Sequence, residues 1–248
     1  MEPAVNLKIL YGNIAMVILQ DRESKNTFSR ALIEGILTRF DEIRKNKDLK
    51  VVVVHGYDNI FCAGGTKEEL IGILENKTSF DDLAFYRILI DCELPTIAAM
   101  QGHALGGGLV FGLYADIVAM AEECIYSTNF MRYGFTPGLG ATLIIPEKLG
   151  INLANEMLFS AKTYHGGELR DRGVPFKIVK KSEVINTAVA IAKELADKPL
   201  ESLKLLKKKM SKKILQQIPE TIKEELAMHK ISFALPGVRE RIENLFGN

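Results

Sequence analysis

The chain has 248 residues, of which 47% are hydrophobic and 25% are charged, and its formal net charge is +1. This near-neutral charge gives no general attraction for nucleic acid or anionic membranes, and no apolar run reaches the roughly 18 residues that a membrane-spanning helix needs. The three cysteines, Cys62, Cys92 and Cys124, lack metal-ligand spacing and fit a reducing compartment. Because the N-terminus has no signal segment, we expect a cytoplasmic enzyme or binding protein.

The first half of the chain alternates strand and helix signals. Residues 5–20 predict two strands joined by a hairpin turn at Gly12 and Asn13. Ser29 can cap a helix over 30–46, where apolar residues recur at helical spacing. The run VVVV at 51–54 is typical of a strand buried on both faces of a parallel sheet.

The pattern then repeats before the chain becomes mostly helical. Helices are expected at 67–75 and 80–90, a strand at 96–100, a helix at 106–113 and a strand at 116–120. Strand–crossover–strand units of this kind predict an α/β fold with right-handed crossovers. After about residue 140 the expected helices are 139–149, 151–160, 182–197, 200–213, 217–232 and 237–246. We therefore divide the chain into a core over 1–195 and a C-terminal helical region over 196–248.

One stretch of this helical region is rich in lysine. Residues 204–213 read KLLKKKMSKK. Such a run predicts a solvated helix face, and the alternative is a docking patch for an acidic partner such as a carrier protein.

Two glycine-rich turns each follow a predicted strand. The first is FCAGGT at 61–66, and the second is GHALGGG at 102–108. In an α/β sheet, the loops that leave the carboxyl ends of the strands form the ligand crevice. Two backbone N–H groups aimed at one point form an oxyanion hole. The alternative is that these glycines serve only tight turns and close packing, because short glycine motifs are unspecific.

The two turns and their flanking residues together identify a protein family more specifically than either turn does alone. The order FCAGGT, PTIAAMQGHALGGGLVFGLYADIV and YGFTPGLGAT resembles the signature of the crotonase (enoyl-CoA hydratase/isomerase) superfamily over nearly the whole chain. The resemblance implies a spiral ββα core, a C-terminal helical region, and a homotrimer or a dimer of trimers. It implies that the backbone N–H groups of Ala63 and Gly107 hold a thioester oxygen, with Gly64 in the same turn.

The resemblance also implies how the acyl group arrives. It would be carried on a pantetheine arm, either of coenzyme A or of an acyl carrier protein, with no other bound cofactor and no metal. The segment DRESKNTF occupies the place where the family contacts that arm. Lys25 is the candidate contact there, and a solvated lysine is the alternative.

Two positions depart from the hydratase pattern. Family hydratases carry one glutamate three residues past Gly107 and another four residues before Gly134; here these positions are Val110 and Phe130. Hydration needs one group to activate water and another to deliver a proton. The sequence therefore predicts a cavity without an acid–base pair of carboxylates, to which Val110 and Phe130 contribute apolar surface.

Decarboxylation of an acyl thioester needs an oxyanion hole but no acid–base pair of carboxylates. ILIDCELPTIAAMQGHALGGGLVFGLYADIV, YSTNFMRYGFTPGLGAT and RGVPFKIV resemble the decarboxylating homologues of polyketide β-branching (HMG-synthase) cassettes. That group implies conversion of 3-methylglutaconyl-acyl carrier protein to 3-methylcrotonyl-acyl carrier protein. It also implies a histidine, matched by His229, and a lysine, matched by Lys77 as first choice and Lys67 as second. The histidine would protonate the dienolate and the lysine would bind the departing carboxylate, although these roles could be exchanged.

The sequence is also compatible with two other functions. One is an enoyl-CoA isomerase or hydratase with a relocated base, which the residues at 110 and 130 oppose. The other is a non-catalytic homologue that binds acyl carrier protein, which the two intact glycine turns oppose. We therefore expect a carbon–carbon lyase with acyl carrier protein as its partner.

Overall fold

A computed structural model describes residues 3–75, 77 and 84–246. Six strands form the larger sheet, in the order β1 (Val5–Leu10), β2 (Ile14–Leu19), β3 (Val51–His55), β5 (Thr96–Met100), β7 (Ile117–Ala121) and β10 (Lys177–Val179). β1 and β2 are the predicted hairpin, and the other neighbouring strands run parallel. All five residues of β3 are buried, as their β-branched run predicted.

A smaller sheet lies beside the first and consists of β4 (Ile60–Cys62), β6 (His103–Leu105), β8 (Ile125–Ser127) and β9 (Thr163–His165). The chain visits the two sheets in turn. β3 leads to β4 and then to helix α2 (Lys67–Leu74), and β5 leads to β6 and then to α4 (Gly107–Leu113). β7 leads to β8, to a 3₁₀ turn at Asn129–Arg132 and to α5 (Ala141–Leu149). These three turns confirm the predicted spiral ββα core.

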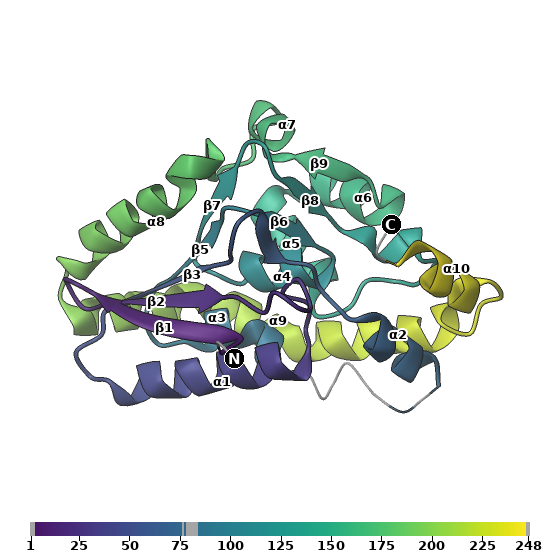
Figure 1. Ribbon diagram of the computed structural model, residues 1–248, viewed down its shortest axis with the longest axis horizontal. Coiled ribbons are helices and arrows are strands. Elements are labelled where there is room, and N and C mark those ends of the chain that lie inside the picture. The colour runs from purple at the N-terminus through teal and green to yellow at the C-terminus, as the bar shows by residue number, and fades with distance from the viewer. Residues whose placement is uncertain (1–2, 76, 78–83, 247–248) are drawn as a thin grey trace.

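The remaining helices cover the outside of the two sheets (Figure 1). α1 (Arg30–Lys45) begins after Ser29, whose side chain accepts a hydrogen bond from Leu32 N–H as the predicted cap. The helix lies against the β1–β2 hairpin, and α8 (Lys181–Ala196) packs across β3, β5 and β7. A 3₁₀ turn (Ala84–Arg87) and α3 (Ile88–Asp91) occupy the described part of the helix expected at 80–90, whose residues 80–83 lie outside the described residues.

The C-terminal half differs from the sequence prediction in two respects. It is less purely helical than expected, because β9 and β10 join the two sheets on either side of α7 (Gly166–Asp171) after α6 (Ile151–Ser160). The helices expected at 200–213 and 217–232 are one helix, α9 (Leu200–Ser232), with Pro219 inside it. A proline costs a helix one hydrogen bond and usually bends or ends it. Here buried residues on both sides of Pro219 fix α9 to the core, so the two segments stay continuous.

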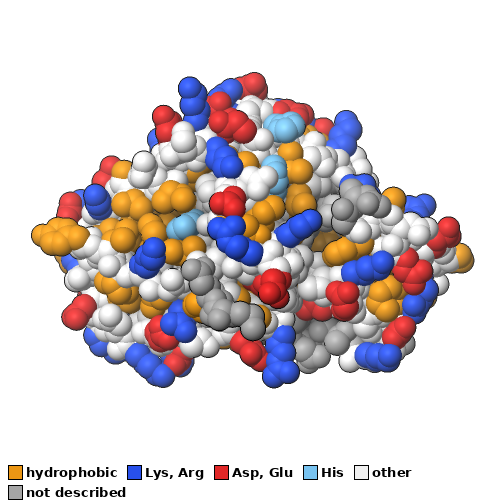
Figure 2. Space-filling model, in the orientation of Figure 1, with side chains coloured by type: hydrophobic (Ala, Val, Ile, Leu, Met, Phe, Trp, Pro, Cys, Tyr) orange, Lys and Arg blue, Asp and Glu red, His pale blue; other side chains and the backbone are white. Residues whose placement is uncertain are grey.

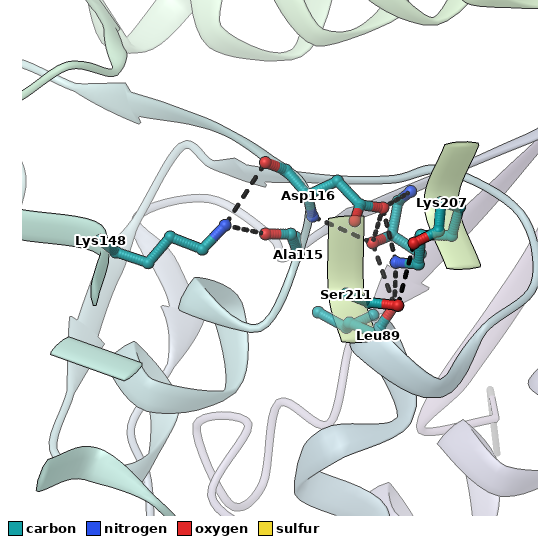
Figure 3. A network of polar contacts seen from close by, with 7 residues as sticks. Leu89, Ala115, Asp116, Lys148, Lys207 and Ser211 are labelled. Carbon is teal, nitrogen blue, oxygen red and sulfur yellow. Dashed lines mark hydrogen bonds and ion pairs between the residues drawn. The ribbon is translucent and has the colours of Figure 1, made fainter. Parts of the chain in front are cut away.

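α9 is fixed to the core through a buried face that is largely polar. Lys207 is only 5% exposed, which corrects the prediction that residues 204–213 form a fully solvated face. Its Nζ donates to an Asp116 carboxylate oxygen at 2.6 Å and to the Leu89 carbonyl at 3.0 Å (Figure 3). On the side of Asp116 away from Lys207, Lys148 of α5 donates to the Ala115 carbonyl at 2.6 Å. A buried ammonium needs such partners, because an unpaired buried charge is strongly unfavourable.

The exposed surface of α9 is mainly charged but also carries large apolar side chains. These apolar side chains are Leu205, Leu206, Met210 and Ile231. Elsewhere on the surface, Figure 2 shows basic and acidic side chains interspersed on the face turned to the viewer, in keeping with the near-zero net charge. No helix among the described residues has the length and apolar character to cross a bilayer. The last helix, α10 (Val238–Leu245), packs against α2 at one end of the molecule (Figure 1).

Candidate active site

The two glycine turns leave neighbouring parallel strands of the smaller sheet. β4 and β6 pair with Cys62 opposite Ala104, so both turns emerge at the same sheet edge. Gly64 has φ +85°, and a β-carbon there would lie 2.6 Å from the Leu105 carbonyl oxygen and 3.2 Å from Gly107 N. Only glycine allows this approach, because a larger residue would force the turns apart. As the first residue of α4, Gly107 has no helical carbonyl for its N–H to bond.

A cavity of about 650 Å³ opens where these turns meet. Ala63 and Gly107 both belong to its wall. One part of the wall is aromatic, contributed by Phe28, Phe130, Tyr133, Phe135 and Phe246, and charged residues such as Arg132 lie in the rest. The aromatic part favours release of neutral CO2 from a carboxylate that is poorly solvated there.

The C-terminal helical region closes one side of the cavity. Phe246, just after α10, stacks on Tyr133 with ring centroids 5.9 Å apart. Lys67 Nζ donates to the Glu243 carbonyl at 3.0 Å, and Arg239 pairs with Glu75 at 3.1 Å. These contacts hold α10 against α2, so residues far apart in the chain form one wall.

The predicted site residues separate into two groups in the structure. Five line the cavity: Ala63, Gly107, Phe130, Lys25 and Lys67. The other four, Gly64, Val110, Lys77 and His229, do not belong to its wall. Val110 is fully buried in α4, so its side chain contributes to the core of the protein rather than to the cavity.

His229 lies directly behind the cavity wall. Its side chain is buried on α9, and Nε2 lies 2.8 Å from the Thr136 carbonyl oxygen. Because a carbonyl can only accept, Nε2 carries the proton of this bond. Phe135 and Leu139, in the same loop, line the cavity. Burial lowers the pKa of His229, while hydrogen bonds to the carbonyls of Thr136 and Pro137 oppose that shift.

The two candidate lysines lie in different environments. Lys67 is half-buried at the start of α2 and belongs to the cavity wall. Lys77 lies just beyond the end of α2, its side chain is 73% exposed, and Nζ pairs with Glu75 at 2.7 Å. Lys25 is exposed at the cavity rim, with φ +54°.

Carboxylates reach the cavity wall, which the sequence analysis did not anticipate. Glu23, Glu68 and Glu69 line it, and the first two are exposed. Glu69 forms a capping box with Thr66: its carboxylate accepts from Thr66 N–H at 2.9 Å, and its own N–H donates to Thr66 Oγ1. Burial raises the pKa of Glu69 despite these bonds. The signal was present in the sequence, since Thr-x-x-Glu at a helix start is the capping-box pattern.

Polar residues of α9 hold the loop at 134–142, and the sequence analysis identified only one of them. Glu225 is 1% exposed; its carboxylate accepts from Gly140 N–H at 2.7 Å, from Thr142 N–H at 2.9 Å and from Thr142 Oγ1. Ser232 Oγ accepts from Thr136 N–H. With His229 between them, these residues recur at helical spacing on one face. That periodicity is the signal that could have revealed them.

Comparison with known proteins agrees with this geometry. The sequence profile of the enoyl-CoA hydratase/isomerase family matches residues 10–244. The chain belongs to this family. Among its members, the bacillaene synthase decarboxylase PksI of Bacillus subtilis (strain 168) is 48% identical over 244 residues, which cover 98% of each chain. A probable mitochondrial enoyl-CoA hydratase of Dictyostelium discoideum is 25% identical over 92% of this chain and 83% of its own.

Solved structures of the same family superpose closely. One chain comes from a study of a dehydratase/decarboxylase enzyme couple involved in polyketide β-branching. It has a TM-score of 0.97 at 47% identity and covers 99% of this chain and 100% of its own. The ECH2 decarboxylase domain of CurF from Lyngbya majuscula has a TM-score of 0.94 at 40% identity, with coverage of 99% and 100%. Within the family, the chain is therefore much more similar to these decarboxylases than to the hydratase named above.

Proposed function

We propose that the protein decarboxylates 3-methylglutaconyl-acyl carrier protein to 3-methylcrotonyl-acyl carrier protein in polyketide β-branching. The observation that carries the proposal is the pair of turns at Ala63 and Gly107, which meet on an aromatic cavity in a chain 48% identical to a β-branching decarboxylase. The acyl group reaches the cavity on a phosphopantetheine arm, with no further bound cofactor. The cytoplasm is the protein's proposed location.

The reaction divides into two steps. First, the bond between the distal carboxyl carbon and its neighbour breaks, CO2 leaves, and the electron pair passes into the extended thioester enolate. The N–H groups of Ala63 and Gly107 stabilise the negative charge on the thioester oxygen, and such donors contribute about 10²–10³-fold in rate each. Second, a proton added to carbon restores a neutral acyl group. His229 is the proton donor in this proposal; because it lies behind the cavity wall, a bridging water carries its proton to the dienolate.

A lysine binds the departing carboxylate before CO2 is lost. Lys67 has the position for this role, in the wall beside the Ala63 turn, while Lys77 is the first choice from the family resemblance and has an exposed side chain. Replacing each by methionine keeps the length of the side chain and removes its charge. The variant that raises KM for the carboxylate-bearing substrate, with binding of the product thioester unchanged, identifies the lysine.

Acyl carrier protein is the proposed partner, and the protein is proposed to act as a homotrimer or a dimer of trimers. Support for the assembly comes from α9, on which Leu205, Leu206 and Met210 are large, apolar and exposed. Burying these side chains against another copy would remove them from water at about 25 cal/mol per Å².

Mass spectrometry tests the proposed reaction. The protein is incubated with carrier protein loaded with the 3-methylglutaconyl group, and the expected product has lost CO2. A gain or loss of water on an enoyl thioester would support a hydratase instead. Retained carrier binding without turnover would support a non-catalytic homologue.

One observation favours a second candidate, enoyl isomerisation. Glu69 lies in the cavity wall with a raised pKa, as a relocated base would. An isomerase would exchange the α and γ hydrogens of 3-methylcrotonyl thioester with deuterated water, and Glu69→Gln would abolish this exchange. Under the decarboxylase proposal, Glu69→Gln keeps CO2 release, because the carboxylate serves to cap α2.

A further inference from the structure

We propose that Asn26 is a positioning residue of the oxyanion hole, and that its side-chain amide sets the direction of the Ala63 N–H. The inference rests on the proposed function of Ala63. Asn26 lies in the loop between β2 and α1 and is fully buried, although it is polar. It does not belong to the cavity wall, whereas its neighbours Lys25 and Thr27 do.

The side chain of Asn26 makes three hydrogen bonds, all of them to backbone groups. Nδ2 donates to the Leu19 carbonyl and to the Phe61 carbonyl, each at 3.0 Å. Oδ1 accepts from Asp21 N–H at 2.8 Å. One amide thus connects the end of β2, the loop and strand β4. Only an amide supplies two donors and an acceptor in this space, and asparagine also tolerates the φ of +51° found here.

The segment around Asn26 also runs beside the turn that carries Ala63. Cys62 Sγ–H donates to the Asn26 carbonyl at 3.0 Å, and Phe28 N–H donates to the Gly64 carbonyl at 2.7 Å. Burial raises the pKa of Cys62 to about 12, so this group stays a thiol and keeps its donor. Ala63 therefore lies between two anchored carbonyls, that of Phe61 before it and that of Gly64 after it.

These anchors matter because an oxyanion hole depends on direction. Its donors must lie about 2.7–3.1 Å from the developing oxyanion, and a displacement of about 1 Å can cost roughly 10²-fold in rate. The Cys62–Ala63 peptide, whose N–H is the donor, begins one residue after the Phe61 carbonyl. Losing the Asn26 amide frees that carbonyl and allows the peptide to rotate. The loss affects the charged enolate more than the neutral thioester, so it lowers kcat more than it raises KM.

The test compares Asn26→Gly with Asn13→Gly. Glycine accepts positive φ at both positions, so each change removes a side chain without adding backbone strain. Asn13 lies in the exposed β1–β2 turn and is the matched control. We expect Asn26→Gly to lower kcat for decarboxylation about 10- to 100-fold with KM changed less than about 3-fold. Asn13→Gly should leave both constants unchanged.

A second readout separates positioning from general structural damage. Infrared spectroscopy of bound 3-methylcrotonyl thioester, labelled with ¹³C at the thioester carbonyl, measures how strongly the two N–H groups polarise that bond. The wild type should shift the carbonyl stretch to lower frequency, and Asn26→Gly should move it back toward the solution value. An unchanged stretch in folded Asn26→Gly would overturn the inference, whether or not activity falls.

Cys62→Ala keeps the test usable if Asn26→Gly does not fold. It removes only the thiol bond to the Asn26 carbonyl, so a smaller shift in the same direction is expected. No shift in Cys62→Ala, with Asn26→Gly unfolded, would count against the inference. The infrared measurement needs no turnover. If the wild type shifts the carbonyl stretch but releases no CO2, only the proposed decarboxylation is rejected. If the wild type does not shift the stretch, the oxyanion hole itself is rejected.

Discussion

The imidazole of His229 is hydrogen-bonded to the loop that it faces, with Nε2 2.8 Å from the carbonyl oxygen of Thr136. The same loop presents Phe135 and Leu139 to the cavity. His229 therefore connects α9 to the cavity wall, and a variant that simply deletes the ring would not separate its proposed chemical role from its structural one.

Replacing His229 by glutamine separates the two roles, because the glutamine amide can still donate to the Thr136 carbonyl. We expect decarboxylation to fall by roughly 10²–10⁴-fold, the contribution of a general acid, while the protein stays folded. Steady-state kinetics with the carrier-bound substrate measures the loss, and circular dichroism checks the fold. His165→Gln, at an exposed position, is the control. Full activity in His229→Gln would remove His229 from the mechanism.

Burial of His229 also predicts a pH dependence of stability. The pKa of His229 in the folded protein is below its ordinary value of 6.5, mainly because of burial. Below pH 6.5 the unfolded chain therefore binds more protons at this residue than the folded one, and stability falls as the pH falls toward the folded pKa. Melting temperatures between pH 7.5 and 5.5 should drop more for the wild type than for His229→Gln. Parallel curves for the two proteins would contradict this prediction.

Glu225 should be important for stability although it touches no substrate. Its carboxylate accepts hydrogen bonds from Gly140 N–H and from the N–H and hydroxyl of Thr142, at the start of α5. Glu225→Ala leaves these buried donors without an acceptor, at about 1–3 kcal/mol each. We expect a loss of about 3 kcal/mol in the free energy of unfolding, measured by urea denaturation. Glu224→Ala, at the exposed neighbouring position, should change it by less than about 0.5 kcal/mol.

Lys207 and Lys208 offer a matched pair within the lysine-rich run. Lys207 is buried and pairs with Asp116, a partly exposed carboxylate, at 2.6 Å, whereas Lys208 is exposed. Lys207→Ala removes the hydrogen bonds from Nζ to Asp116 and to the Leu89 carbonyl, at a cost of about 1–3 kcal/mol, because Asp116 itself stays in contact with water. Lys207→Ala should therefore be less stable than the wild type in urea denaturation, and Lys208→Ala should not. Equal stability of the two variants would show that the pair does not hold α9 to the core.

A glutamate at position 110 should not turn the protein into a hydratase. The position is fully buried in α4, and its partner position 130 would still carry phenylalanine. Val110→Glu buries an unpaired carboxyl group, so we expect a loss of several kcal/mol in stability and no hydration of an enoyl thioester. Val110→Leu controls for side-chain size. Measurable hydration by Val110→Glu alone would contradict the argument that two carboxylates are required.

The local elements and the two glycine turns could be predicted from the sequence alone. The β1–β2 hairpin, the Ser29 cap of α1, the buried strand at 51–54 and the glycine turns at 61–66 and 102–108 depend on residues that are neighbours in the chain. Turn chemistry, capping and periodicity act over a few residues, so a sequence shows them directly.

The tertiary structure alone decided which side chains share a cavity and which face of a helix is buried. Lys67 and Phe246 are far apart in sequence yet line one wall, and α9 buries Lys207 and Glu225 while leaving Leu205 and Ile231 exposed. Helical periodicity identifies which residues share a face but not what that face contacts. The contacts come from partners distant in the chain, such as Asp116 for Lys207 and Thr142 for Glu225, and only folding brings those groups together.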